Sequence, residues 1–211
     1  VESSIANGSF TSDKSLFYFS ICEGFGSCKI YEGKLTKDSI VAYSQLPAPI
    51  NLPDVSSTHP FITEVKGKKV LVFSSNREGG QGGMDLWTSS YKGKWSTPEN
   101  LGKGVNTLGN ELTPFFDNDS NKLYFSSDWH YNIGGFDVFS VKGKFPSSWE
   151  EVFNMGIPYN SPLNDLYYIA TSESEGFLTS SREGSKTEKD APCCNDIYDF
   201  KKEQKIVEAV K

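Results

Sequence analysis

The chain has 211 residues, enough for one all-β domain with a sizeable core, and aromatic residues make up 14% of it, which favours strands over helices. The net charge is −6 without any basic block, so nucleic acid is not an expected partner. No apolar run approaches the roughly 18 residues of a membrane-spanning helix. The sequence starts at Val1 and shows no signal peptide, so we expect a mature or excised piece of a longer protein.

One pattern recurs four times along the chain. Each copy runs from an apolar strand ending in small hydroxyl residues, through a polar or glycine-rich turn, to an Asp-aliphatic-aromatic triplet or its equivalent. The hydroxyl positions Ser20, Ser74, Ser126 and Ser180 lie 52 or 54 residues apart. A fixed period near 50 residues, built from short strands, is typical of a β-propeller with one four-stranded antiparallel blade per repeat. The sequence therefore predicts an all-β propeller with four visible blades.

The predicted blades follow one another without linkers. They cover residues 8–57, 58–109, 110–163 and 164–200. Residues 201–211 are expected to form a linker or a short helix. Because the first repeat opens so close to Val1, we also expect these four blades to belong to a larger propeller, with an unpaired edge at blade one.

The four cysteines lie in the first and last repeats. Cys22 and Cys28 flank a turn, so they can face each other across a hairpin and form a disulfide, which implies an oxidising compartment. Cys193 and Cys194 are adjacent, and a vicinal disulfide is their only local option. The alternative is four free thiols. Their spacing does not suggest a zinc site.

An acidic residue recurs at the start of the third strand of three blades. Asp85, Asp137 and Asp196 occupy this position, and Lys29 replaces the acid in blade one. Such a carboxylate can accept N–H bonds from its own turn, so we interpret the three as structural, with ligand binding as the alternative.

Signatures of catalysis and metal binding are sparse. His59 and His130 read as surface residues, and neither a nucleophile elbow nor a Walker motif is present. Residues 117–121 imitate a calcium loop, but Lys122 stands where that loop needs glycine, so we predict a blade turn. No cofactor or metal is expected.

The best candidates for a binding surface are loops between the second and third strands. Trp129, His130 and Tyr131 form an aromatic loop tip, and Arg77 lies in the matching loop of blade two. Tryptophan, tyrosine and arginine are the residue types that most often anchor interfaces. The alternative is that Trp129 folds back onto blade three.

The repeat is best kept in residues 60–87 and 112–139, and there it resembles the PD40, or WD40-like, β-propeller family of the TolB type. Residues 95–111 and 193–198 look like the propeller of OmpA-family peptidoglycan-associated outer-membrane lipoproteins, which include a PorE-type component of the type IX secretion system.

This resemblance implies a non-enzymatic protein-interaction scaffold in the periplasm, associated with the outer membrane, because the family pattern contains no catalytic residue. Its partners would be other envelope or secretion-system proteins, without a direct membrane span. Peptidoglycan would be reached only through domains that this chain does not contain. The alternative is a propeller glycoside hydrolase or glycan-binding module, which a solvent-open pair of carboxylates in the central channel would favour.

Overall fold

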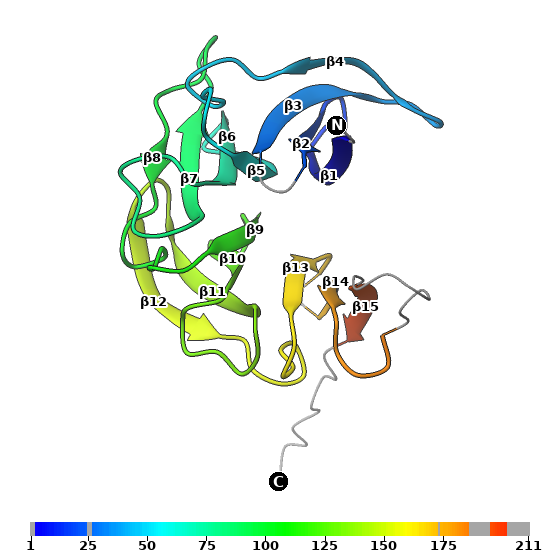
Figure 1. The fold of residues 1–211 in the computed structure, drawn as a ribbon, viewed down its shortest axis with the longest axis vertical. Coiled ribbons are helices and arrows are strands. Elements are labelled where there is room, and N and C mark those ends of the chain that lie inside the picture. Colours follow the sequence, from blue (N-terminus) through cyan, green and yellow to red (C-terminus); the bar gives the residue numbers. More distant parts are fainter. Residues whose placement is uncertain (1–2, 25–26, 173, 186–194, 202–211) are drawn as a thin grey trace, which may run out of the picture.

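The computed structural model describes residues 3–24, 27–172, 174–185 and 195–201. Throughout these ranges the secondary structure is all β, and the strands form four antiparallel sheets arranged as a four-bladed propeller (Figure 1). The predicted fold class is therefore confirmed. A helix suited to crossing a membrane does not occur in the described ranges.

Each blade is a meander of strands that follow one another in sequence. Blade one contains β1 (Ser3–Phe10), β2 (Phe17–Glu23), β3 (Ser27–Leu35) and β4 (Ile40–Gln45). Blade two contains β5 (Ser57–Val65), β6 (Lys68–Ser75), β7 (Asp85–Ser90) and β8 (Glu99–Asn100). Blade three contains β9 (Glu111–Asp117), β10 (Lys122–Ser127), β11 (Asp137–Lys144) and β12 (Ser148–Asn154). Blade four contains β13 (Asp165–Ala170), β14 (Glu175–Ser180) and β15 (Asp196–Lys201).

The strand bounds differ in detail from the sequence-based ones. β1 begins at Ser3, ahead of the predicted blade start at residue 8, and residues 202–211 lie outside the described residues. In blade four the register pairs Leu166 with Thr179, whereas in blade two it pairs Thr58 with Ser74. Thr179 is thus the counterpart of Ser74. Ser180, which the sequence repeat had suggested, lies one residue further along β14.

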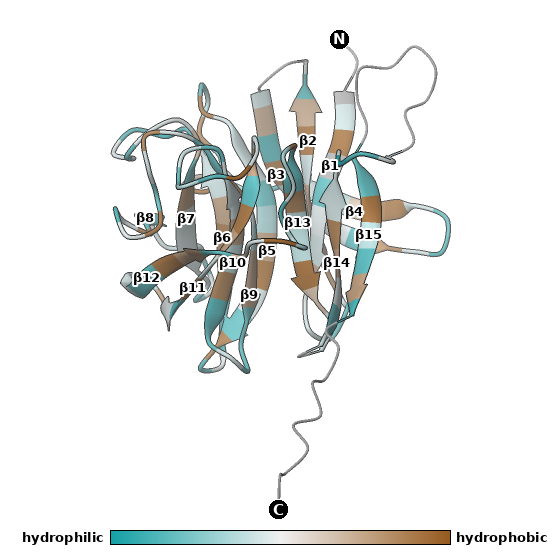
Figure 2. Cartoon of the chain, turned by 90° about the horizontal axis from the view of Figure 1, so that it is seen from below, coloured by the Kyte–Doolittle hydropathy of each residue, from teal (hydrophilic) through white to brown (hydrophobic). Residues whose placement is uncertain are grey.

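The hydrophobic core lies between the blades. Leu71, Phe73 and Trp87 of blade two pack against blade one, whereas Val72 and Leu86 of the same blade pack against blade three. Successive residues of a strand point to opposite faces, so a blade covered on both sides needs apolar residues at nearly every position. Figure 2 shows these apolar segments along the strands.

The innermost strands form an open chain of contacts around the propeller axis. β1 packs against β5, β5 against β9, and β9 against β13. Among the described residues, no comparable contact joins blade four to blade one, and Figure 1 shows the open side between them. The ring is not closed by these four blades.

The predicted hairpin disulfide is confirmed. Cys22 and Cys28 are paired across β2 and β3, and their sulfur atoms are 2.01 Å apart. Cys193 and Cys194 lie outside the described residues.

Two of the three recurring aspartates hold their own hairpins together. Asp85 accepts hydrogen bonds from the backbone N–H groups of Gln81 and Gly82 and, at 2.8 Å, from the Asn100 amide. Asp137 accepts the equivalent bonds from the turn before it and from Asn154, the latter at 2.8 Å. The third, Asp196, is the first residue of β15.

The lysine of blade one replaces this arrangement with its chemical opposite. Lys29 Nζ donates to the carbonyl oxygens of Leu52, Pro53 and Val55. The lysine ammonium donates to carbonyl oxygens, whereas the aspartate carboxylate of the other blades accepts from N–H groups. At this position either side chain therefore bonds the start of the third strand to a loop.

Residues 117–121 form the turn between β9 and β10. The Asp117 carboxylate accepts bonds from Asp119 N at 3.0 Å and Ser120 Oγ at 2.5 Å. Its oxygens bind the turn itself.

Candidate functional site: a pocket on the propeller axis

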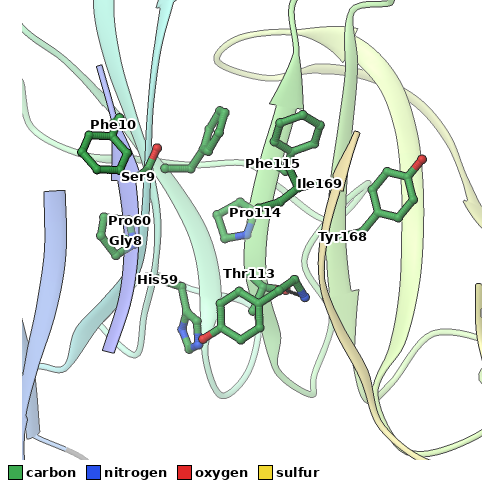
Figure 3. A pocket seen from close by; sticks show the side chains of 12 residues that line it. Gly8, Ser9, Phe10, His59, Pro60, Thr113, Pro114, Phe115, Tyr168 and Ile169 are labelled. Carbon is green, nitrogen blue, oxygen red and sulfur yellow. Dashed lines mark hydrogen bonds between the residues drawn. The ribbon is translucent and has the colours of Figure 1, made fainter. Parts of the chain in front are cut away.

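A pocket of about 250 Å³ lies where the four innermost strands meet (Figure 3). Each of β1, β5, β9 and β13 contributes three consecutive residues to it. These are Gly8–Phe10, His59–Phe61, Thr113–Phe115 and Tyr167–Ile169. Three of the four triplets are spaced by 54 residues, so the pocket is a product of the repeat.

A β-bulge in each innermost strand shapes this pocket. Asn7, His59, Thr113 and Tyr167 have left-handed backbones, with φ of 55°, 50°, 51° and 54°, and the strand register shifts around each of them. Left-handed φ is uncommon for residues other than glycine, and it is least favourable for the bulky tyrosine and the β-branched threonine. Bulges and strained residues of this kind cluster at functional sites, so the four of them indicate a candidate site at the propeller axis.

His59 is the chemically distinctive residue of the pocket. Its Nδ1 is buried without a hydrogen-bond partner, and its ring centroid is 5.7 Å from that of Tyr167. Burial lowers the pKa of His59 to about 4, so the imidazole is neutral at pH 7 and offers one donor and one acceptor nitrogen. The sequence-based interpretation of His59 as a surface residue is wrong.

The polar groups beside His59 differ in how many hydrogen bonds they already make within the protein. Thr113 Oγ1 donates to Ser126 Oγ at 3.0 Å and accepts from Tyr167 N at 3.3 Å, so its hydroxyl is engaged by the framework. Burial raises the pKa of the Tyr167 phenol, which keeps it protonated and able to donate. Tyr167 and His59 are therefore the groups best placed to exchange hydrogen bonds with a ligand.

The other end of the pocket is apolar. Figure 3 places Phe10 and Phe115 at the end opposite His59 and Thr113. The Phe61 and Phe115 rings meet edge to face at 5.4 Å. A concave site with aromatic walls and a few convergent polar groups is the usual form of a small-ligand site.

The two buried carboxylates of the innermost strands belong to the framework. Glu111 and Asp165 begin β9 and β13 and are fully buried. Glu111 accepts bonds from Thr107 and Ser127, and Asp165 accepts one from Arg182 at 2.8 Å. Burial raises the pKa of Glu111, although these bonds oppose the shift. Of the described residues that line the pocket, none is a carboxylate.

Arg77 is part of the core, not of a binding loop. Its guanidinium donates to the carbonyl oxygens of Pro49 and Ile50, at 3.0 and 2.6 Å, and to the hydroxyls of Ser57 and Ser75, at 3.2 and 3.1 Å. Burial lowers its pKa to about 10. The expectation that Arg77 anchors a partner is corrected by this position, because the side chain clamps the loop between blades one and two.

The aromatic loop of blade three lies away from the pocket and faces solvent. Trp129 is 60% exposed and Tyr131 is exposed, so Trp129 does not fold back onto its blade. His130 Nε2 lies 3.0 Å from the Val105 carbonyl oxygen, and the ring packs against Phe139. The loop presents two aromatic side chains and uses its histidine as internal support.

The pocket residues were not predicted from the sequence, because the residue type at equivalent positions differs from blade to blade. A signal was nevertheless present, since His59-Pro60-Phe61 and Thr113-Pro114-Phe115 share a Pro-Phe pair 54 residues apart. A proline inside a predicted strand marks an edge or a bulge, and this pair marked the bulge.

Comparison with family models finds no match, and comparison with curated proteins finds none. Solved structures do match. TolB from Acinetobacter baumannii superposes with a TM-score of 0.56 at 12% identity, over 93% of this chain and 41% of its own. An α-L-arabinofuranosidase from Lactobacillus brevis gives 0.55 at 12% identity, over 82% and 62%. A GH43 endo-arabinanase from Bacillus licheniformis gives 0.50 at 13% identity, over 82% and 63%.

The chain thus has the fold of a β-propeller similar to that of TolB, and it spans less than two thirds of each of these proteins. The comparisons give no support to the narrower resemblance to OmpA-family lipoproteins or to the type IX secretion system. The expectation that the chain is not an enzyme is corrected, since an arabinofuranosidase and an arabinanase share its fold.

Proposed function

We propose that the chain is a glycan-binding propeller that holds one sugar residue of a carbohydrate chain in the axial pocket. The observation that carries the proposal is His59 Nδ1, a buried polar atom without a partner, which belongs to a residue that lines the pocket. A buried polar atom left unsatisfied costs about 1–3 kcal/mol, which a hydrogen bond with a ligand hydroxyl would recover.

The chemistry of the pocket suits a neutral sugar. Hydroxyl groups both donate and accept, which matches the neutral His59 imidazole and the protonated Tyr167 phenol. Aromatic rings such as Phe61 and Phe115 offer apolar faces to the C–H surface of a sugar ring. At about 250 Å³ the pocket is smaller than the roughly 300 Å³ at which drug-sized sites begin, so it fits one ring of a longer chain.

Calorimetric titration with neutral oligosaccharides tests the proposal, and arabino-oligosaccharides are the first choice because two similar structures act on arabinose-containing substrates by name. Replacing Tyr167 by Phe should weaken binding about tenfold, the value of one hydrogen bond. Tyr131→Ala, on the outer loop, is the matched control. Chromatography of the same mixtures scores released sugars, so hydrolysis would be seen directly. Unchanged affinity in the Tyr167 variant, or no binding by any oligosaccharide, would reject the pocket as a glycan site.

The exposed aromatic loop favours a second candidate, a protein-interaction scaffold of the periplasm. Trp129 and Tyr131 have the composition of an interface anchor, and the Cys22–Cys28 disulfide supports an oxidising compartment such as the periplasm. Attachment to the outer membrane and secretion-system partners would follow from the sequence resemblance. Affinity capture from native envelopes, with the Trp129→Ala, Tyr131→Ala double variant as the comparison, tests this candidate.

A further inference from the structure

We propose that the open side of the propeller, between blade four and blade one, is an interface that receives one further four-stranded antiparallel blade of the same polypeptide. The inference is independent of what the axial pocket binds. It rests on positions that are buried between neighbouring blades elsewhere in the propeller and are uncovered here.

The first such position lies on the third strand. The register makes Ile197 of β15 the counterpart of Leu86 in β7 and Val138 in β11, since the three pair with Thr179, Ser74 and Ser126. Leu86 and Val138 pack against the following blade and are 0% exposed. Ile197 is 75% exposed. Ile197 thus has the side chain of an inter-blade position, but no following blade covers it.

The second position lies on the central strand and repeats the observation. Phe177 of β14 corresponds to Val72 and Tyr124, which pair with Phe61 and Phe115 as Phe177 pairs with Ile169. Val72 is 0% exposed and Tyr124 7%, whereas Phe177 is 47% exposed. The face of blade four that points away from blade three is therefore an inter-blade face without its neighbour.

Blade one has the complementary face. Phe10 corresponds to Ile62 of blade two, which is 4% exposed against blade one, but Phe10 itself is 41% exposed. Around it, aromatic rings contact one another in a continuous ladder, from Phe10–Phe17 at 4.6 Å through Phe17–Phe19 at 5.6 Å to Phe19–Tyr31 at 5.9 Å. Phe19 is buried within this ladder, whereas Phe10 is exposed at its end, and an exposed apolar patch of this kind marks an interaction surface.

One sheet with two apolar faces would cover the exposed face of blade four and the exposed face of blade one at the same time. Blades two and three are such sheets, because each covers the preceding blade with one face and the following blade with the other. In a second copy, blades one and four each have only one uncovered face, because their other faces pack on blades two and three, so neither blade could cover both surfaces at once. Continuity with the established inter-blade contacts therefore points to a blade, supplied in the same polypeptide, as the occupant.

Tandem duplication of one period tests the inference. Residues 111–164 comprise β9–β12 and the connection to β13, so repeating them in place creates a five-blade chain with native junctions. The probe is Ile197→Cys in a Cys193→Ser, Cys194→Ser background, and the readout is its alkylation rate. Val138→Cys and Tyr131→Cys serve as buried and exposed controls.

In the 211-residue chain the thiol at position 197 should react at a rate close to the one at 131. In the five-blade chain it should slow at least about tenfold as blade four becomes covered. If that duplication does not fold, repeating residues 57–110 provides the same test. The proposal is overturned by a thiol at 197 that is already protected in the 211-residue monomer. It also fails if neither duplication protects the thiol, or if protection rises with concentration as light scattering shows a dimer.

Discussion

Acidification should weaken the fold through one residue, His59. Burial lowers the pKa of its imidazole from 6.5 to about 4, which means that the folded chain favours the neutral form. Between these pH values the unfolded chain binds more protons, so the contribution is complete above pH 6.5 and is lost as the pH falls towards 4. At 1.36 kcal/mol per pKa unit, the loss is about 3 kcal/mol of the free energy of unfolding.

Urea denaturation of the wild type and of His59→Asn, at intervals from pH 7 to pH 4, measures this effect. Asparagine is chosen because it tolerates the left-handed backbone at this position and does not titrate. Carboxylates titrate alike in both proteins, so the difference between the two curves isolates the histidine. His130→Asn removes the other histidine and serves as the control. Parallel curves for wild type and His59→Asn would show that the imidazole accepts its proton in the folded chain, and the reasoning from burial would be refuted.

Three further changes have defined outcomes. Arg77→Met should cost about 3 kcal/mol in denaturant titration, because it leaves buried carbonyl and hydroxyl groups without their donor, and a stability within error of wild type would contradict the clamp. Replacing Cys22 and Cys28 by Ser should lower stability by about 2 kcal/mol, the loop entropy of a short hairpin, as thermal unfolding with and without reductant will show. The Trp129→Ala, Tyr131→Ala double variant should keep the wild-type melting temperature while losing partner capture; a large fall in melting temperature would place the loop in the core.

The repeat made the architecture predictable. Strands of a propeller blade are apolar on both faces and are separated by turns, and this alternation leaves a periodic trace that residues 60–87 and 112–139 keep clearly. The hairpin disulfide followed from spacing, because Cys22 and Cys28 flank a single turn. Local pattern and fold coincide in these features.

The site was harder to predict because it depends on backbone conformation. A left-handed residue inside a strand has no side-chain signature when it is His59 in one blade and Tyr167 in another. Arg77 was misplaced for a related reason: arginine in a loop is usually exposed, and only the three-dimensional approach of residues 49–50 buries it. Ring closure could not be predicted either, because it depends on the angle at which neighbouring blades pack, and the sequence pattern of a single blade does not determine that angle.

The open chain of contacts along β1, β5, β9 and β13 also sets the order in which the molecule comes apart. Hydrogen bonds between blades join residues about one period apart, such as Ile62 N with Ser9 Oγ and Tyr167 N with Thr113 Oγ1. These bonds tie each blade to its immediate neighbours, as in a one-dimensional array, and the His59–Tyr167 ring contact adds a link from blade two to blade four. Blades one and four have a single neighbour each, so they open first, and amide exchange slows from both ends towards a last cooperative unit made of blades two and three.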